Sequence, residues 1–196
     1  MGADKTRMLA MALQMLQDAG YVYIGMDHFA LPEDGLAVAK RQGRLHRNFQ
    51  GYSTRPDGDL IALGVSAIGS MGTSYVQNAR SLDEYSDLLN QGRLPVVKGL
   101  SLTRDDLARR SIIMALMCQG RVELADIEQS HLLEFQHYFV RELLQLQDFV
   151  NQGMVKLDAH VIEVTAAGWY VVRAIAMVFD KYAQADGQRA HFSKIL

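Results

Sequence analysis

The spacing of apolar residues changes near residue 100, and this change limits the folds that are open to the chain. In residues 4–19, apolar side chains recur at helical spacing, and Gly20 follows where helices commonly end. Residues 21–25 then favour a short strand, and residues 33–42 favour a second helix. Helix and strand patterns that alternate in this way are typical of an α/β fold.

Three further segments complete this first pattern. Residues 46–59 combine polar and aromatic residues with glycine and proline, a composition that predicts a loop. Leu60 to Val65 is a continuous apolar run, as expected for a strand buried on both faces of a parallel sheet. Residues 81–90 favour a helix, with Ser81 as its N-cap and Gly92 just beyond its end.

Helical spacing dominates from residue 101 onward. Thr103 and Asp106 fit a capping-box variant that opens a helix extending to about Gln119. A second apolar stripe extends from Phe135 to Val150 and ends at Gly153.

A predicted β-hairpin interrupts these helices. Residues 154–158 and 161–165 alternate apolar and polar side chains on either side of a short turn. Thr165 can then cap a last helix that carries Trp169. The order of helix, helix, hairpin and helix resembles a winged-helix domain. We expect its boundary with the first half within residues 92–102, which contain two glycines and a proline.

Composition excludes several classes of protein. The chain has 196 residues, of which 49% are hydrophobic, with 20 basic and 22 acidic residues and a net charge of −2. This balance favours neither nucleic acid nor an anionic membrane as a partner. The longest apolar runs are too short for a membrane span. The first residues lack a signal-peptide pattern, so we interpret the start of the sequence as a truncation.

Cysteine and histidine usage argues against a metal site. The single cysteine, Cys118, excludes an intramolecular disulfide, and it fits a reducing cytosol, so we expect a cytoplasmic protein. The six histidines form no HxxxH pair and no set with a cysteine. Cys118 falls in a predicted helix beside two methionines, where a lone cysteine is usually a core residue. We therefore predict no metal ligands in this chain.

The most distinctive motif is Gly25-Met-Asp-His-Phe-Ala30, and Asn48-Phe-Gln-Gly-Tyr52 follows it. Within the first motif, Asp27 and His28 form either a structural pair or a catalytic pair, and the sequence leaves both open. Residues 23–54 closely resemble the oxygen-independent coproporphyrinogen III oxidases, which are radical S-adenosylmethionine enzymes of haem biosynthesis. The resemblance continues to residues 191–196 at the end of the chain.

The resemblance implies a 4Fe–4S cluster, S-adenosylmethionine and coproporphyrinogen III in the intact enzyme, which would form protoporphyrinogen IX by oxidative decarboxylation. The family's CxxxCxxC cluster motif is missing from this sequence. We therefore interpret the chain as an inactive carboxy-terminal fragment. The implied fold is α/β plus mostly α: the later part of a partial (β/α) TIM-like barrel over residues 1–98, then a winged-helix-like domain over residues 99–196.

Two residues become cofactor-binding candidates through the resemblance. Ile68 follows the apolar run, in a segment of small residues that is either an ordinary connection or a place where a ligand approaches the backbone. The resemblance implies that Ile68 contacts S-adenosylmethionine, mainly through its main chain. Gln50 corresponds to a residue near a second S-adenosylmethionine. No catalytic residue is assigned.

The sequence leaves two interpretations open for the basic residues between positions 40 and 47, and it also leaves alternative functions open. The cluster is either a solvated helix end or a docking surface for propionate carboxylates. Its members are Lys40, Arg41, Arg44, His46 and Arg47. A haem-binding or haem-delivery relative is one alternative function, and residues 25–30 argue against it. A DNA-binding winged-helix regulator is another alternative function. Residues 101–196 contain 10 basic and 12 acidic residues, and this balance argues against binding to DNA. The resemblance implies a monomer.

Overall fold

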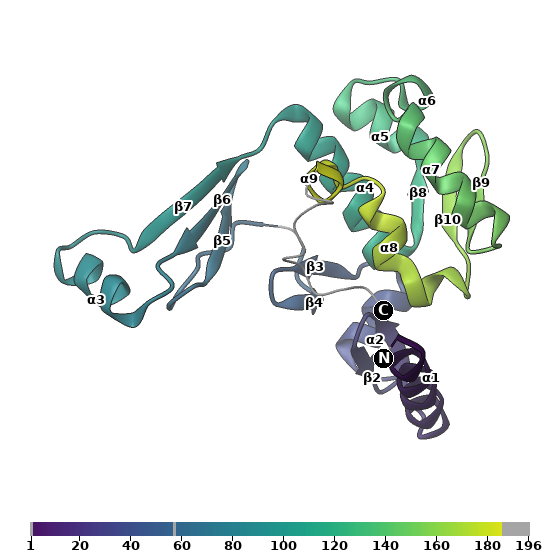
Figure 1. The fold of residues 1–196 in the computed structure, drawn as a ribbon, viewed down its shortest axis with the longest axis horizontal. Coiled ribbons are helices and arrows are strands. Elements are labelled where there is room, and N and C mark those ends of the chain that lie inside the picture. The colour runs from purple at the N-terminus through teal and green to yellow at the C-terminus, as the bar shows by residue number, and fades with distance from the viewer. Residues whose placement is uncertain (1, 57, 186–196) are drawn as a thin grey trace. The chain divides into compact units, whose positions relative to one another are not determined.

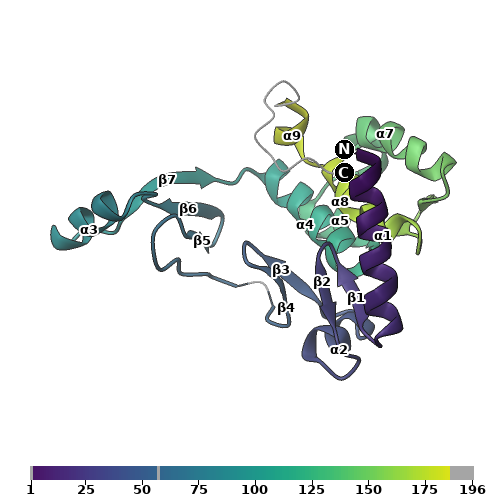
Figure 2. The same cartoon turned by 60° about the horizontal axis from the view of Figure 1, so that its bottom comes forward.

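The computed structural model describes residues 2–56 and 58–185. The chain divides into two compact units, of which the first contains Met1–Arg55 together with Arg109–Leu196 and the second contains Pro56–Ala108. Figures 1 and 2 show helices and short strands in both units. Every strand pairing in the described residues is antiparallel. The chain is therefore a mixed α/β protein without a parallel sheet in its described part.

The first unit begins with the helix that the sequence predicts. Helix α1 (Gly2–Asp18) ends before Gly20, whose φ of 88° suits a glycine. Strands β1 (Val22–Gly25) and β2 (His28–Ala30) then form a hairpin, so the predicted strand is confirmed. Helix α2 (Gly35–Arg41) follows, as predicted.

A second hairpin corrects the loop that was predicted over residues 46–59. Strands β3 (His46–Asn48) and β4 (Gly51–Ser53) pair antiparallel, with Arg47 opposite Tyr52. The prediction was wrong here because the strands are three residues long and mix polar with aromatic side chains, so they show no clear alternation.

The rest of the first unit is mainly helical and follows α4 (Arg104–Gln119). It also contains a three-stranded sheet in the order β8-β10-β9, which Figure 1 shows beside α7. The predicted hairpin is confirmed as β9 (Val155–Leu157) and β10 (Val161–Val164). The remaining elements are β8 (Arg121–Glu123), α5 (Leu124–His131), α6 (Phe135–Tyr138), α7 (Val140–Asn151), η1 (Gly168–Val171), α8 (Val172–Met177) and α9 (Lys181–Ala185).

The helix starts predicted at Thr103 and Thr165 are confirmed, whereas the predicted helix from Phe135 to Val150 is divided into α6 and α7. The Thr103 main-chain N–H donates to Asp106 Oδ2 at 2.8 Å, and the Asp106 N–H donates to Thr103 Oγ1 at 3.2 Å, so the capping box is present. Thr165 Oγ1 accepts from the Gly168 N–H at 3.1 Å at the start of η1. Helix α5 was not predicted, and it ends at Leu132, which has a φ of 54° where a glycine signal is usual.

Aromatic side chains and one ion pair hold the helices of this unit together. Phe135, Phe139 and Phe179 are fully buried, with ring centroids 4.9, 5.7 and 6.4 Å apart in pairs. Arg109 on α4 donates to Glu142 on α7 at 2.7 Å, and both side chains are largely buried. Burial of these rings contributes to the hydrophobic stabilisation of the unit.

The second unit is a three-stranded antiparallel sheet with one helix. Its strands lie in the order β5 (Ile68–Met71), β6 (Ser74–Asn78) and β7 (Val96–Ser101). Helix α3 (Leu82–Asn90) starts at the predicted N-cap, where Ser81 Oγ accepts from the Glu84 N–H at 3.2 Å. Because residues 96–101 form β7, the expected boundary region contains a strand. The division into residues 1–98 and 99–196 stays a prediction.

The predicted parallel strand from Leu60 to Val65 is wrong for this structure. Only Leu60 takes part in a bridge, with Ser70, and that bridge is antiparallel. Ile61 and Leu63 are 74% and 83% exposed. An apolar run forms a buried parallel strand only where parallel strands pair with it and helices cover both faces of the sheet. Every strand pairing in the described residues is antiparallel. None of the described helices has the length and apolar character needed to cross a membrane.

Candidate functional site

The two hairpins of the first unit, residues 22–30 and 46–53, meet through a pair of glycines, and we call them the hairpin pair. Gly25 has a φ of 153°, and a side chain there would overlap the Tyr52 hydroxyl. Gly51 has a φ of 130°, and a Cβ there would lie 2.6 Å from His28 Nε2. Each hairpin thus leaves room for a ring of the other. This contact explains why both sequence motifs contain a glycine at these positions.

Tyr52 links the hairpin pair to the helical part of the unit. Its side chain is buried, and its hydroxyl donates to the Met117 carbonyl on α4 at 3.0 Å. Burial raises the pKa of Tyr52, and the nearby Arg47 charge opposes this effect only in part. The phenol therefore stays protonated and keeps its hydrogen bond at neutral pH.

The His28 imidazole packs edge-on against the Tyr52 ring, with the ring centroids 5.2 Å apart. Its Nδ1 lies 2.9 Å from Asp27 Oδ1, but the two atoms lack hydrogen-bond geometry. Asp27 is 88% exposed, at the two-residue turn between β1 and β2. An exposed carboxylate with this contact does not orient the imidazole as a buried one would. Asp27 and His28 therefore form no hydrogen-bonded pair here, and both interpretations of the motif stay predictions.

Lys40 and Trp169 both bind the end of β1. Lys40 Nζ donates to the main-chain carbonyls of Tyr23 at 2.7 Å and Ile24 at 2.8 Å, and it lies 4.2 Å from the centroid of the Trp169 ring. Trp169 Nε1 donates to the same Ile24 carbonyl at 3.1 Å. Burial lowers the pKa of Lys40 to about 8. The last part of the chain thus fixes the strand that leads into the first motif.

The other basic residues of the 40–47 segment differ in their contacts. Arg41 donates to the Pro32 carbonyl at 2.7 Å, and Arg44 hydrogen-bonds the Gln42 side chain. Arg47 instead lies over the Tyr52 ring, with its Cζ 4.9 Å from the ring centroid. Its Nη1 is buried and has no hydrogen-bond partner among the described residues. The segment therefore does not act as one uniform basic surface.

The two cofactor candidates from the sequence lie in different units. Gln50 is exposed in the β3–β4 turn, and its main-chain N–H donates to Asn48 Oδ1 at 2.9 Å. Ile68 is half-buried at the start of β5, opposite Gln77. The structure does not bring the two residues together within one unit, and their roles stay predictions.

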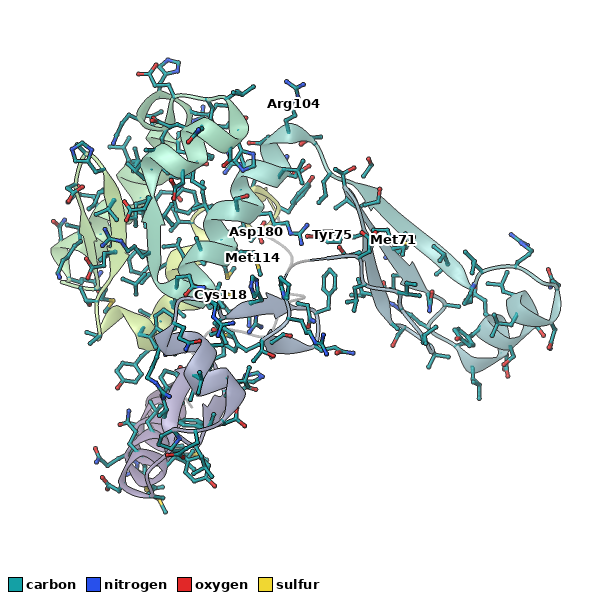
Figure 3. The ribbon with its side chains drawn as sticks, turned by 180° about the vertical axis from the view of Figure 1, so that it is seen from behind. Met71, Tyr75, Arg104, Met114, Cys118 and Asp180 are labelled. Carbon is teal, nitrogen blue, oxygen red and sulfur yellow. The ribbon has the colours of Figure 1, made fainter. Side chains whose placement is uncertain are left out.

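A 4Fe–4S cluster does not fit the residues of this chain. Cys118, the one cysteine in the sequence, is buried on α4, which also carries Met114 (Figure 3). Within residues 2–56 and 58–185, no three His, Cys, Asp or Glu side chains are grouped so that they could hold a metal ion. Such a cluster needs several thiolate ligands. No step of a reaction can therefore be assigned to a cluster held by this chain.

Sequence reasoning missed the structural roles of Lys40, Tyr52 and Trp169. Trp169 was assigned to a helix stripe, although its indole reaches β1. The usable signals were Gly25 and Gly51, because a glycine inside a short strand often marks the close approach of another group. Which groups approach them could not be read from spacing.

A family comparison identifies the second half of the chain. Residues 102–171 match the family model described as the HemN C-terminal domain. This part of the chain is therefore similar to the HemN C-terminal domain. This domain contains Trp169 and Met117, so it supplies both anchors of the hairpin pair.

Curated relatives extend the similarity beyond the HemN C-terminal domain. The oxygen-independent coproporphyrinogen III oxidase of Escherichia coli (strain K12) is 42% identical over 193 residues, which cover 98% of this chain and 42% of the relative. The enzyme of that name from Synechocystis is 38% identical over 98% of this chain and 42% of its own length. The one from Thermostichus vulcanus is 42% identical over 99% of this chain and 60% of its own length.

A solved structure is also similar, and its title describes coproporphyrinogen III oxidase from Escherichia coli as a radical SAM enzyme. It matches with a TM-score of 0.85 and 44% identity, over 89% of this chain and 40% of that one. The chain thus spans about two-fifths of the length of most of these relatives. The resemblance inferred from residues 23–54 is confirmed.

Proposed function

We propose that this chain forms part of an oxygen-independent coproporphyrinogen III oxidase, which converts coproporphyrinogen III to protoporphyrinogen IX in haem biosynthesis. The observation that carries the proposal is the 42% identity to the Escherichia coli enzyme over 98% of the chain. The hairpin pair supports it, because the two motifs that resemble the oxidases are the segments that contact each other through Gly25 and Gly51.

Within such an enzyme, the chain would position groups rather than perform the radical chemistry. S-adenosylmethionine would supply that chemistry together with a 4Fe–4S cluster whose ligands lie outside this chain. The Tyr52–Met117 and Trp169–Ile24 hydrogen bonds fix the hairpin pair against the HemN C-terminal domain. We propose that Gln50 and Ile68 contact S-adenosylmethionine, Ile68 mainly through its main chain.

Two finer features of the fold belong to the same proposal. Helices α4, α5 and α7 beside the β8-β10-β9 sheet support a winged-helix-like domain. Helix α1 followed by β1 is the kind of unit from which a (β/α) barrel is built, and it supports a place for residues 1–98 in the later part of such a barrel. We further propose a cytoplasmic, monomeric enzyme with a small-molecule substrate and no nucleic-acid partner.

A chimera tests this function. In it, the chain replaces the part of the Escherichia coli relative that it matches, and the product is purified without oxygen. We expect the chimera to convert coproporphyrinogen III to protoporphyrinogen IX, while the 196-residue chain alone does not. Iron and sulfide content is measured in parallel with that of the unmodified relative. A chimera with full cluster content and no conversion would contradict the proposal.

A further inference from the structure

Arg47 differs from its basic neighbours in the contacts of its charged group. Lys40, Arg41 and Arg44 each donate a hydrogen bond to an oxygen of this chain, so their side chains fasten local structure. Arg47 Nη1 is buried, and within the described residues it has no partner. A buried donor without a partner is rare in folded proteins and calls for an explanation.

The guanidinium of Arg47 is held in a defined place. Arg47 and Tyr52 are direct cross-strand partners, and the guanidinium carbon lies 4.9 Å from the Tyr52 ring centroid. Tyr52 is itself fixed by its hydrogen bond to Met117 and by its close approach to Gly25. A charged group positioned in this way loses little conformational freedom when it binds a ligand.

We propose that Arg47 binds a carboxylate group of a ligand. The proposal rests on the proposed function, whose substrate carries propionate carboxylates and whose cofactor S-adenosylmethionine carries an amino-acid carboxylate. A guanidinium presents its N–H donors in a planar fork that matches a carboxylate, and it stays charged at any physiological pH. A carboxylate here would satisfy the Nη1 donor that the protein leaves without a partner.

The surroundings of Arg47 suit such a ligand. The His28 ring also packs against the Tyr52 ring, with the ring centroids 5.2 Å apart. The nearby carboxylate of Asp27 contacts His28 Nδ1 at 2.9 Å and is otherwise exposed to solvent. The Arg47 guanidinium interacts with the Tyr52 side chain, whereas that of Arg109 pairs with a buried glutamate.

Binding to the 196-residue chain tests the site directly. Coproporphyrin III, the stable oxidised form of the substrate, is titrated into the chain while calorimetry and Trp169 fluorescence are recorded. We expect Arg47→Gln to weaken its affinity by about tenfold or more, because a hydrogen bond to a charged group is lost. The matched control Arg44→Gln, which removes an equal charge from a side chain bonded to Gln42, should change affinity by less than about twofold.

Two further arms identify the source of the carboxylate. Coproporphyrin III tetramethyl ester lacks carboxylates, so its affinity should be the same for the wild type and Arg47→Gln. S-adenosylmethionine is titrated in the same way. If Arg47→Gln weakens the binding of coproporphyrin III, the carboxylate that Arg47 binds is a propionate. If the variant weakens the binding of S-adenosylmethionine, it is the amino-acid carboxylate. Arg47→Lys keeps the charge without the fork, and we expect an intermediate affinity.

A measurement on the wild type avoids reliance on variants that could misfold. With ¹⁵N-labelled arginine, the side-chain resonances of Arg47 should shift when the ligand is added. The proposal is overturned if the Arg47 resonances do not shift, or if the wild-type chain binds neither ligand. It is also overturned if Arg47→Gln binds both ligands as tightly as the wild type, or if Arg44→Gln loses as much affinity as Arg47→Gln. An active chimera with no Arg47 effect would leave the proposed function intact. An inactive chimera with Arg47-dependent binding would overturn the function and not the site.

Discussion

The Trp169 indole N–H donates to the Ile24 carbonyl at 3.1 Å, across 145 residues of sequence. Gly120 makes this contact possible, because a Cβ there would lie 2.7 Å from the indole ring. Lys40 donates to the same carbonyl, so two donors from different parts of the chain hold the end of β1. The segment that matches the HemN C-terminal domain therefore helps to shape the hairpin that carries the first motif.

Trp169→Phe removes the indole donor and keeps an aromatic ring. The Ile24 carbonyl retains Lys40, so it is not left without a partner. We expect a loss of about 0.5–1.5 kcal/mol in the free energy of unfolding, the usual net value of one hydrogen bond. Urea unfolding followed by far-UV circular dichroism measures it. Tyr170→Phe is the control, since Tyr170 is half-exposed. Equal stability of the two variants would show that the Trp169 bond adds nothing.

The Lys40 ammonium predicts a pH dependence of stability. Its pKa is lowered to about 8 in the folded chain by burial, from an ordinary value of 10.5. Between these values the unfolded chain binds more protons, so this residue makes stability rise as pH increases from about 8 to about 10.5. Lys40→Met should flatten that rise.

Urea unfolding at about pH 7 and at about pH 10, on either side of this window, measures the effect. Other groups also titrate there, so the comparison is with Lys98→Met, which removes an exposed lysine of β7. An identical pH slope in the two variants would mean that Lys40 has the same pKa in the folded and unfolded chain. The neutral amine still donates hydrogen bonds, so the two carbonyl contacts persist above pH 8 in the wild type.

Gly25→Ala should destabilise the hairpin pair more than Gly20→Ala does. Both glycines have positive φ, 153° and 88°, so both variants carry backbone strain. A Cβ at Gly20 meets nothing within 4 Å, whereas one at Gly25 overlaps the Tyr52 hydroxyl. We expect Gly25→Ala to cost about 1–3 kcal/mol more, the usual range for overpacking. Thermal unfolding of both variants gives the comparison, and similar losses would mean that Tyr52 moves aside freely.

The ion pair between Arg109 and Glu142 predicts that substitutions at these two residues have strongly non-additive effects on the free energy of unfolding. Arg109→Met should cost about 3–5 kcal/mol, because it leaves the buried Glu142 carboxylate without this partner. The double variant Arg109→Met, Glu142→Met should regain part of that loss, since two apolar side chains replace two charges. The exposed pair of Arg121 and Glu123 is the control, and Arg121→Met should cost less than about 1 kcal/mol. Additive losses in the double variant would contradict this account.

The sequence predicted most helix ends and one hairpin because these depend on local chemistry. Ser81, Thr103 and Thr165 accept hydrogen bonds from N–H groups that lie three residues away. Gly20 adopts the positive φ that ends a helix. Such contacts lie within a few residues, so short-range patterns are enough to find them.

Local reasoning failed where pairing partners decide the outcome. The run from Leu60 to Val65 has the composition of a buried strand, yet strand formation requires neighbours, and Ile61 and Leu63 are exposed. The β3–β4 hairpin was missed for the opposite reason, since a polar sequence becomes a strand once Arg47 and Tyr52 stand opposite each other. Helix α5 ends at a leucine in a conformation that glycine usually adopts, so its end gave no signal.

The sequence by itself determined the relatedness to oxygen-independent coproporphyrinogen III oxidases, the helix caps and the hairpin of the second half. It also determined that one cysteine cannot hold an iron–sulfur cluster. Only the tertiary structure decided that Gly25 faces Tyr52, that Gly51 faces His28, and that Arg47 alone among the arginines between 40 and 47 keeps a buried nitrogen without a partner in the described residues. These contacts join residues far apart in sequence, and their geometry depends on how the hairpins and helices pack together.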